Sequence, residues 1–523
     1  MSKRKRLKQV GVKQHGDPPE TNVQQVEEEP TSVGEKQEFI DRYVVIEPFG
    51  RVAITRGSEG KLQYFVAEPE LDAKEIRELE RLKKILLEEA VLPLEKVKEA
   101  AFVEGFLRKQ IKKTIRNHKL RIPDDRLEEF FYYIMRDFLG YEALDVFMKD
   151  PNIEDISCDG EGIPLYVWHK FYENLQTSVS LSRKELDSVI LRLAYRTGYQ
   201  ITVSNPILDG DLPDGSRAHI ALGEVSRRGG SFTIRKFSEK PFTVVDLISF
   251  GEISAEVAAY LWIMIENFRS LMISGATASG KTTLLNAIAM FIFPESKICT
   301  IEETREIRLP HENWVPLVTR QVFHEGIKEI TLFDLLKSSL RQRPDYIVVG
   351  EVRGEEAYTL FQAIGTGHGG LCTIHSDSID TSVKRLLTKP MDVPLMLIPL
   401  MQVGIHVSRV RVDGETTRRV VEIKETIGID EETEQIEFNP AFNWGGEDND
   451  DFLFSGRSII FEKMAEQKFI PIETYYEELE DRAELLRWMA LRKRMTYNEI
   501  AETIRRFYYD KDGVMQEVRL GES

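Results

Sequence analysis

The stretch GATASGKT, residues 275–282, decides the fold of this chain. It fits the pattern G-x-x-x-x-G-K-[ST] of a loop that binds phosphate groups. The apolar run 271–273 before it predicts a buried strand, and residues 283–290 after it predict a helix. Glycines let backbone N–H groups surround phosphates, and the start of a helix favours negative charge. The sequence therefore predicts a strand, a phosphate-binding loop and a helix.

The loop predicts a nucleoside triphosphate as ligand. Lys281 is expected to reach the β- and γ-phosphates of ATP, and the Thr282 hydroxyl to bind Mg²⁺. Nine residues of this segment are predicted to bind the nucleotide: Gly275, Ala276, Thr277, Ala278, Ser279, Gly280, Lys281, Thr282 and Thr283.

Carboxylates follow two other apolar runs. Residues 346–350 form a run that ends in Glu351, which is expected to hold Mg²⁺ through water. The shorter run 297–300 precedes Glu302, Glu303 and Glu306. Hydrolysis needs a group that orients or deprotonates the attacking water, and one of these acids at a strand end has that chemistry. The alternative is that this acidic cluster is a solvated surface.

Two histidines lie near a glycine-rich turn. His368 lies within the turn, and His375 ends a short predicted strand. We interpret them as phosphate sensors or hydrogen-bonding relays rather than metal ligands, because no convincing set of Cys and His ligands surrounds them. A purely structural role is the alternative.

Four arginines precede the loop in the chain: Arg217, Arg227, Arg228 and Arg235. Arginines beside a nucleotide stabilise the charge that develops on phosphate during its transfer. Surface arginines that pair with this acidic protein are the alternative, and spacing alone favours neither.

Composition narrows the class of protein. The chain has 523 residues, which predicts several domains, and 42% hydrophobic residues, which is typical of globular proteins. A net charge of −17 disfavours general binding to nucleic acid. The three cysteines lie far apart and form no C-x-x-C pair, so neither zinc nor disulfides are expected, and the compartment expected is a reducing cytoplasm. No apolar stretch is long enough to span a bilayer.

The composition and hydrophobic pattern of the sequence divide it into four predicted regions. Residues 1–37 are polar and predict a disordered tail. Its basic start is a solvated run or, alternatively, contacts an anionic membrane surface or a partner. Residues 38–150 predict an α-rich domain that binds a partner, and 151–237 a second, α/β domain, with a turn at 209–211. Residues 238–523 predict a linker and an ATPase domain with a helical end.

Together, the blocks 275–282, 300–306, 343–353 and 366–375 resemble the secretion ATPase superfamily of type II and type IV secretion, type IV pili and the archaellum. Asp214 to Arg217, Thr233 to Phe237 and Arg343 to Asp345 look most like its archaeal GspE/FlaI branch. The resemblance covers roughly residues 40–510. It implies a homohexamer of RecA-like ATPase domains, each preceded by a PAS-like α/β domain and a further N-terminal domain, with the nucleotide between the last two domains of one subunit.

The resemblance also implies roles for single residues. Glu306 falls where the family carries its catalytic glutamate, and Glu302 and Glu303 occupy earlier acidic positions. Many members have Asp-Pro where this chain has Glu303-Thr304, which leaves open which acid polarises water. Glu351 matches the metal-organising glutamate. The other matches are the histidines His368 and His375, and the phosphate-contacting arginines Arg217 and Arg235, with Arg227 or Arg228 assisting.

The sequence thus predicts an ATP-hydrolysing motor at the cytoplasmic face of a membrane, acting on a polytopic platform protein to build a filament or export a substrate. The four-cysteine zinc module of bacterial type II members is missing, which favours the archaeal branch and no zinc. Two alternatives are a nucleic-acid translocase, which the acidic balance disfavours, and a scaffold that binds ATP but barely hydrolyses it.

Overall fold

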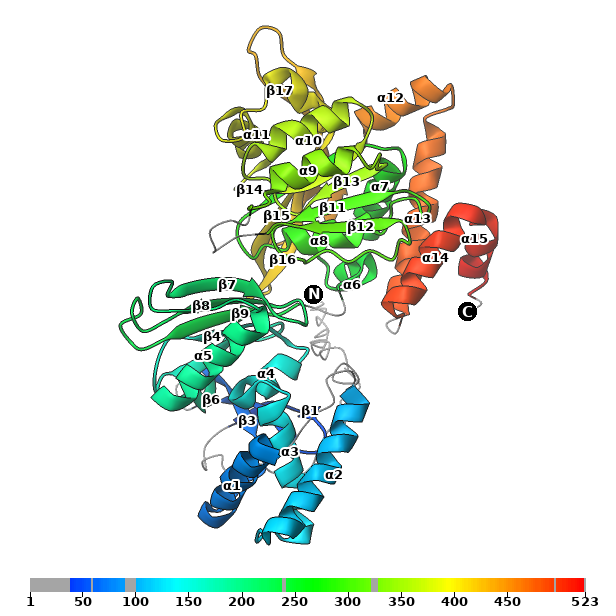
Figure 1. Ribbon diagram of the computed structural model, residues 1–523. Helices are drawn as coiled ribbons and strands as arrows, with labels where there is room; N and C mark the ends of the chain where they lie inside the picture. Colours follow the sequence, from blue (N-terminus) through cyan, green and yellow to red (C-terminus); the bar gives the residue numbers. More distant parts are fainter. Residues whose placement is uncertain are drawn as a thin grey trace, which may run out of the picture. The chain divides into compact units, whose positions relative to one another are not determined.

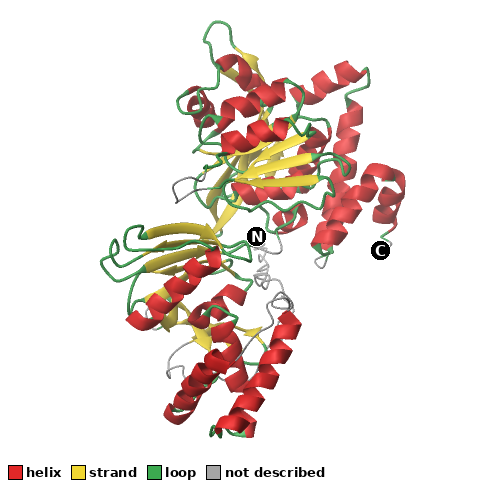
Figure 2. Ribbon diagram, viewed as in Figure 1, coloured by secondary structure: helices red, strands yellow, loops and turns green. Residues whose placement is uncertain are grey.

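The computed structural model describes residues 38–57, 60–89, 100–237, 241–320, 328–492 and 495–521. The chain forms two compact units, Met1–Phe237 and Ser238–Ser523, and each is built on a nine-stranded sheet (Figures 1 and 2). The tail predicted over residues 1–37 lies outside the described residues.

The sheet of the first unit has the strand order β1-β2-β3-β6-β5-β4-β9-β8-β7. Neighbouring strands are antiparallel except β3 and β6, which pair in parallel. The strands are β1 (Glu38–Ile46), β2 (Gly50–Arg56), β3 (Leu62–Ala67), β4 (Ile153–Cys158), β5 (Pro164–His169), β6 (Glu173–Ser180), β7 (Ile207–Asp211), β8 (Arg217–Ala221) and β9 (Ser231–Arg235).

Helices of the first unit form two groups. Helix α5 (Arg183–Thr197) begins with a capping box between Ser182 and Glu185 and buries Leu186, Val189 and Leu193 in the core of the sheet. A second core lies among the helices α1 (Ala73–Glu89), α2 (Ala100–His118) and α3 (Leu127–Phe138). The short helix α4 (Asp145–Lys149) leads into β4.

The predicted border at residue 150 lies between strands of one continuous sheet. β1 to β3 come from the predicted N-terminal domain, and β4 to β9 from the predicted second domain. The buried carboxylate of Asp150 joins the two parts, because it accepts hydrogen bonds from the hydroxyls of Tyr43 on β1 (2.8 Å) and Tyr64 on β3 (2.6 Å). The first unit therefore folds around a shared sheet.

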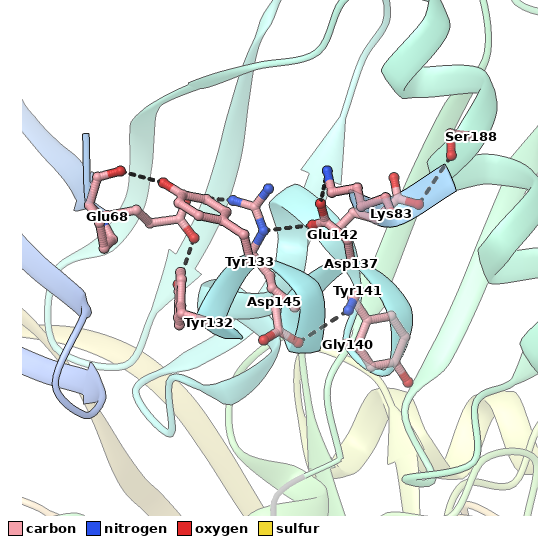
Figure 3. A network of polar contacts seen from close by, with 12 residues as sticks. Glu68, Lys83, Tyr132, Tyr133, Asp137, Gly140, Tyr141, Glu142, Asp145 and Ser188 are labelled. Carbon is pink, nitrogen blue, oxygen red and sulfur yellow. Dashed lines mark hydrogen bonds and ion pairs between the residues drawn. The ribbon is translucent and has the colours of Figure 1, made fainter. Parts of the chain in front are cut away.

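A polar network ties the helices of the first unit together (Figure 3). Glu68 accepts a hydrogen bond from the Tyr132 hydroxyl (2.6 Å) and pairs with Arg136 (2.6 Å). Arg136 also pairs with Asp137, which in turn pairs with Lys83 of α1 (2.6 Å). These contacts fix α1 and α3 against the end of β3.

The sheet of the second unit has the order β12-β11-β13-β14-β10-β15-β16-β17-β18. Its first six strands are parallel, and the last three continue it in antiparallel fashion. The strands are β10 (Leu271–Gly275), β11 (Ile298–Glu302), β12 (Trp314–Val318), β13 (Tyr346–Val349), β14 (Gly369–His375), β15 (Val403–Val412), β16 (Glu415–Ile429), β17 (Ile436–Trp444) and β18 (Phe452–Phe454).

Helices cover both faces of this sheet (Figure 1). α7 (Ala255–Glu266) and α8 (Lys281–Ala289) share a core with Leu271, Ile273 and Val348, while α9 (Leu332–Leu340) and α10 (Glu356–Gly365) share one with Met272, Ile347 and Val349. Adjacent residues of one strand thus face opposite layers. The remaining helices are α6 (Val244–Ser249), α11 (Ile379–Leu387), α12 (Ile459–Lys468), α13 (Glu473–Leu491), α14 (Tyr497–Tyr509) and α15 (Lys511–Leu520).

This architecture confirms the predicted α/β class with a RecA-like ATPase domain. The turn predicted at 209–211 is wrong, because these residues belong to β7. Asp209 pairs with His219 of β8 in the ladder, and the backbone of Gly210 packs so closely on the end of α5 that an added Cβ would lie 2.9 Å from Thr197 Cβ. Tertiary pairing overrides the local turn preference of Asp-Gly here.

Candidate functional site

The loop at 275–282 lies between β10 and α8, as the sequence predicts. Gly280 precedes the first residue of α8 with φ 96°, a left-handed conformation that favours glycine. At the other end, a Cβ on Gly275 would lie 2.5 Å from the Val407 carbonyl oxygen. Both glycines of the motif are therefore required by the backbone, one for its conformation and one for a close approach.

Lys281 is the first residue of α8 and is buried, with 8% of its surface exposed. Its ammonium donates to the Ala276 carbonyl oxygen at 2.8 Å. Burial lowers the pKa of Lys281, and the carboxylates of Glu351 and Glu306 oppose that shift. The structure thus brings the loop lysine and both predicted acids into one electrostatic environment. Thr282 and Thr283 are half-buried on the first turn of the same helix.

Glu351 lies two residues after the end of β13, and β14 separates β13 from β10 in the sheet. Its carboxylate accepts a hydrogen bond from Arg353 at 2.7 Å, and Arg353 also pairs with Glu303 at 3.2 Å. Arg353 therefore links the acid after β13 to the acidic cluster after β11. Glu356 orients this turn by accepting from the backbone N–H groups of Arg353 and Gly354.

Glu302 is the last residue of β11 and is buried, with 2% exposed. Its Oε1 accepts from the backbone N–H groups of Glu306 (2.9 Å) and Ile307 (2.8 Å). Its Oε2 has no hydrogen-bond partner within the described part of the chain. Burial raises the pKa of Glu302 to about 7, and the two backbone hydrogen bonds oppose the rise. Glu302 thus holds the turn that carries the exposed Glu306.

The two histidines lie at opposite ends of β14. His375 ends the strand and is in register with Gly275 of β10, so its backbone borders the first glycine of the loop. His368 precedes the strand, where its Nδ1 lies 3.0 Å from the Ala363 carbonyl oxygen. The length of the strand separates them by about 20 Å. The structure brings His375 to the loop, and His368 to the opposite edge of the sheet.

In the first unit, Arg217 of β8 and Arg235 of β9 are direct cross-strand partners. Arg217 makes a two-pronged pair with Asp209 (2.7 and 2.6 Å), and Arg235 bonds Asp155 at 3.3 Å. Arg227 and Arg228 lie in the loop at the other end of this hairpin, about 14 Å away along β9. The structure therefore groups Arg217 with Arg235 and separates both from Arg227 and Arg228.

Oxygen donors suit the predicted magnesium ion. Mg²⁺ prefers hydroxyl, carboxylate and phosphate oxygens, and Thr282 and Glu351 supply the first two kinds. Among the residues described, no three His, Cys, Asp or Glu side chains gather as a metal site. In the same residues, no helix is both long and apolar enough to cross a membrane.

Three charged residues near the loop were not predicted. Arg353 lies two residues after Glu351, and its bridging role is visible only once β11 and β13 are neighbours. Glu252 and Arg418 flank Gly280, where an added Cβ would lie 3.0 Å from Glu252 Oε1 and 3.2 Å from Arg418 Cδ. They come from segments 28 residues before and 138 residues after this glycine, and neither belongs to a motif.

The chain has relatives among known proteins. The MJ0900 protein of Methanocaldococcus jannaschii is 38% identical over 481 residues, 89% of this chain and 85% of that protein. A probable conjugal transfer protein TrbB of Sinorhizobium fredii is 33% identical over 256 residues, 48% of this chain and 76% of its own length.

Among solved structures, the VirB11 ATPase of Brucella suis is 26% identical, with a TM-score of 0.28, over 53% of this chain and 93% of that chain. The Legionella pneumophila ATPase DotB is 17% identical, with a TM-score of 0.40, over 72% and 93%. Residues 172–485 match the family described as Type II/IV secretion system protein. The chain therefore belongs to the type II/IV secretion system protein family, the secretion ATPase superfamily that its motifs resemble.

Proposed function

We propose that this protein hydrolyses ATP and uses the energy to drive secretion or the assembly of a pilus-like or archaellum filament. The observation that supports the proposal is that Lys281, Glu351 and Glu306 follow the parallel strands β10, β13 and β11 of one sheet, and that both carboxylates act electrostatically on Lys281. This is the set of charges that a nucleotide-hydrolysing loop requires, with a cation for the phosphates and acids for metal and water.

Each residue has a proposed task. Backbone N–H groups of residues 275–282 and the start of α8 bind the β- and γ-phosphates, together with Lys281. Thr282 and Glu351 hold Mg²⁺, which neutralises phosphate charge when bound. Glu306 orients the attacking water, and Glu302 keeps Glu306 in place through the two backbone hydrogen bonds.

The second unit binds the phosphates, and the first unit supplies Arg217 and Arg235 as a paired cationic group. Both arginines already contact carboxylates, so a phosphate would take them over from Asp209 and Asp155. Contacts of these arginines to a γ-phosphate would break on hydrolysis, which would couple the chemistry to movement. A homohexamer in the cytoplasm, bound to a polytopic platform protein at the inner face of the membrane, would pass such steps around a ring.

The names of several relatives favour a second candidate. Proteins called conjugal transfer protein TrbB are 33% and 32% identical to this chain over about half its length. A nucleic-acid motor would bind DNA in a salt-dependent manner. The net charge of −17 argues against it.

The test is ATP turnover by the purified chain, with sedimentation to measure its oligomeric state. Lys281→Ala is expected to abolish binding and turnover, and Glu351→Gln to abolish turnover while ATP still binds. Wild-type protein that binds ATP without any turnover, alone or with anionic lipid, contradicts the motor and favours a scaffold. Turnover that DNA raises, and that 200 mM salt suppresses, would favour the nucleic-acid motor instead.

A further inference from the structure

Two arginines face each other on the hairpin β15–β16. Arg409 and Arg418 are direct partners in the antiparallel ladder, so their side chains leave the same face. Arg411, two residues further along β15, shares that face. Like charges directly opposite one another destabilise a sheet. Within the part of the chain that the structure describes, none of the three arginines forms an ion pair, and Glu252 is the carboxylate on which the charge of Arg418 acts.

This hairpin lies beside the phosphate-binding loop. β15 pairs with β10 up to Ser274, opposite His406, and then continues past the loop toward Arg409. The Val407 carbonyl oxygen touches the position that a Gly275 side chain would take, and Arg418 Cδ touches the corresponding position of Gly280. The stem of Arg418 thus lies against the last glycine of the loop, next to the start of α8.

A buried carboxylate lies at the same place. Glu252 is 4% exposed, and its Oε1, directed at Gly280, has no hydrogen-bond donor within the residues that the structure describes. The charges that act on it belong to Arg418 and Arg419, and Arg419 is committed to Asp450 at 2.6 Å. Glu252 therefore attracts Arg418 toward the loop and provides a reason for its position there.

The order of the strands gives the bound nucleotide a direction. Glu306 and Glu351 follow β11 and β13, which lie on one side of β10, whereas β15 and β16 lie on the other side. The γ-phosphate must point toward the acids, because hydrolysis occurs there. The α-phosphate and nucleoside lie at the other end of the triphosphate chain, so we expect them on the side of β15 and β16.

We propose that Arg418, assisted by Arg409, binds the α-phosphate of the nucleotide held by residues 275–282. This inference rests on the proposed function, since it takes the ligand of that site to be ATP. The Arg418 stem and the Glu252 carboxylate both lie against Gly280, so the guanidinium would bridge Glu252 and the α-phosphate, and Arg409 would add a second positive charge from the opposite strand. Arg418 is a nucleotide-binding residue that no motif of the sequence indicates.

Loss of the Arg418 side chain is expected to weaken nucleotide binding without slowing the hydrolysis step. The charge of the α-phosphate does not change when the γ-phosphate is cleaved, so Arg418 contributes equally to substrate, transition state and ADP. Loss of such a contact raises KM and leaves kcat unchanged. A cation that instead acted on the γ-phosphate of a neighbouring subunit would lower kcat and leave ADP affinity alone.

The experiment compares Arg418→Gln, Arg418→Lys and wild type in calorimetric titrations with ATP and with ADP, followed by kcat at saturating ATP. Arg457→Gln, which removes an exposed arginine paired with Glu462, is the matched control. Arg418→Gln is expected to weaken both nucleotides roughly 10- to 100-fold, the loss expected for a charge-assisted hydrogen bond, with kcat within about twofold. Arg418→Lys is expected to recover part of that affinity.

Unchanged ATP and ADP affinities in Arg418→Gln, with binding intact in the wild type, overturn this inference alone. Lower kcat with unchanged ADP affinity also overturns it, because the arginine would then act on the γ-phosphate. A wild-type protein that binds neither nucleotide overturns the proposed function as well. Circular dichroism spectra of the variants exclude misfolding as the cause of weaker binding.

Discussion

Replacing Glu302 by glutamine is expected to change how the stability of the second unit depends on pH. Burial raises the pKa of this carboxyl group from 4.5 to about 7. Between these values the folded chain binds more protons than the unfolded chain, so the free energy of unfolding falls as pH rises. The stabilisation is complete below about pH 4.5 and is lost as pH rises through about 7.

The size of the effect follows from the shift. At about 1.36 kcal/mol for each pKa unit, the full change is about 3 kcal/mol, of which about 2.5 kcal/mol falls between pH 5 and 8. Glu302 is almost fully buried, so solvent screening reduces this value little. The glutamine keeps an acceptor for the N–H groups of Glu306 and Ile307 but cannot ionise.

The assay is urea unfolding of both proteins from pH 5 to 8, followed by tryptophan fluorescence, since four of the five tryptophans lie in the second unit. The difference in unfolding free energy, variant minus wild type, is expected to rise by about 2.5 kcal/mol over this range. Burial also raises the pKa of Glu252 to about 7, but this residue is present in both proteins, so its contribution cancels in the difference. Glu303→Gln controls for removal of an exposed carboxylate. A difference that stays constant within about 0.5 kcal/mol would refute the reasoning.

Three further changes test other parts of the structure. Gly280→Ala places a Cβ on a residue with φ 96° and against Glu252, so we expect the free energy of unfolding to fall by about 1–2 kcal/mol in urea unfolding. We also expect the variant to lose ATP binding in a titration. An unchanged urea midpoint would contradict the left-handed backbone at this residue. Asp150→Asn removes the charged acceptor of two buried tyrosine hydroxyls and is expected to destabilise the first unit by about 3 kcal/mol in calorimetric unfolding. A loss below about 1 kcal/mol would contradict the role of Asp150 in joining the two parts of the sheet. Arg353→Gln breaks the exposed ion pairs with Glu351 and Glu303 and is expected to change the free energy of unfolding by less than about 1 kcal/mol. It is expected to lower ATP turnover about tenfold, because Glu351 is no longer held in place. Equal turnover in variant and wild type would show that the Arg353 ion pairs have no role in hydrolysis.

Local chemistry made the loop predictable. The glycines at 275 and 280 have backbone demands that few other residues meet, and the flanking apolar runs are long enough to show a strand and a helix. Glu351 was predictable for the same reason, since it follows a short apolar run that is typical of a buried strand and forms β13.

Other features of the site depend on contacts between residues that are distant in the sequence or separated by a strand or turn. His368 and His375 are close in the chain, yet an intervening strand sends them to opposite edges of the sheet. Glu302 was predicted only as one acid among three, because its burial and its two backbone hydrogen bonds arise from the turn that follows β11. Arg418 lies beside the loop because its strand β16 pairs with β15, which in turn pairs with β10. The sequence does not show this order of strands.

The continuity of the first sheet limits how proteins of this kind can diversify. A genetic exchange that replaced residues 38–150 alone would have to preserve the parallel pairing of β3 with β6 and both tyrosine contacts of Asp150 at once. An exchange at the border between Phe237 and Ser238 leaves that sheet whole. Exchange of the entire first unit is therefore expected to preserve folding, whereas exchange of its first half alone is expected to disrupt the shared sheet.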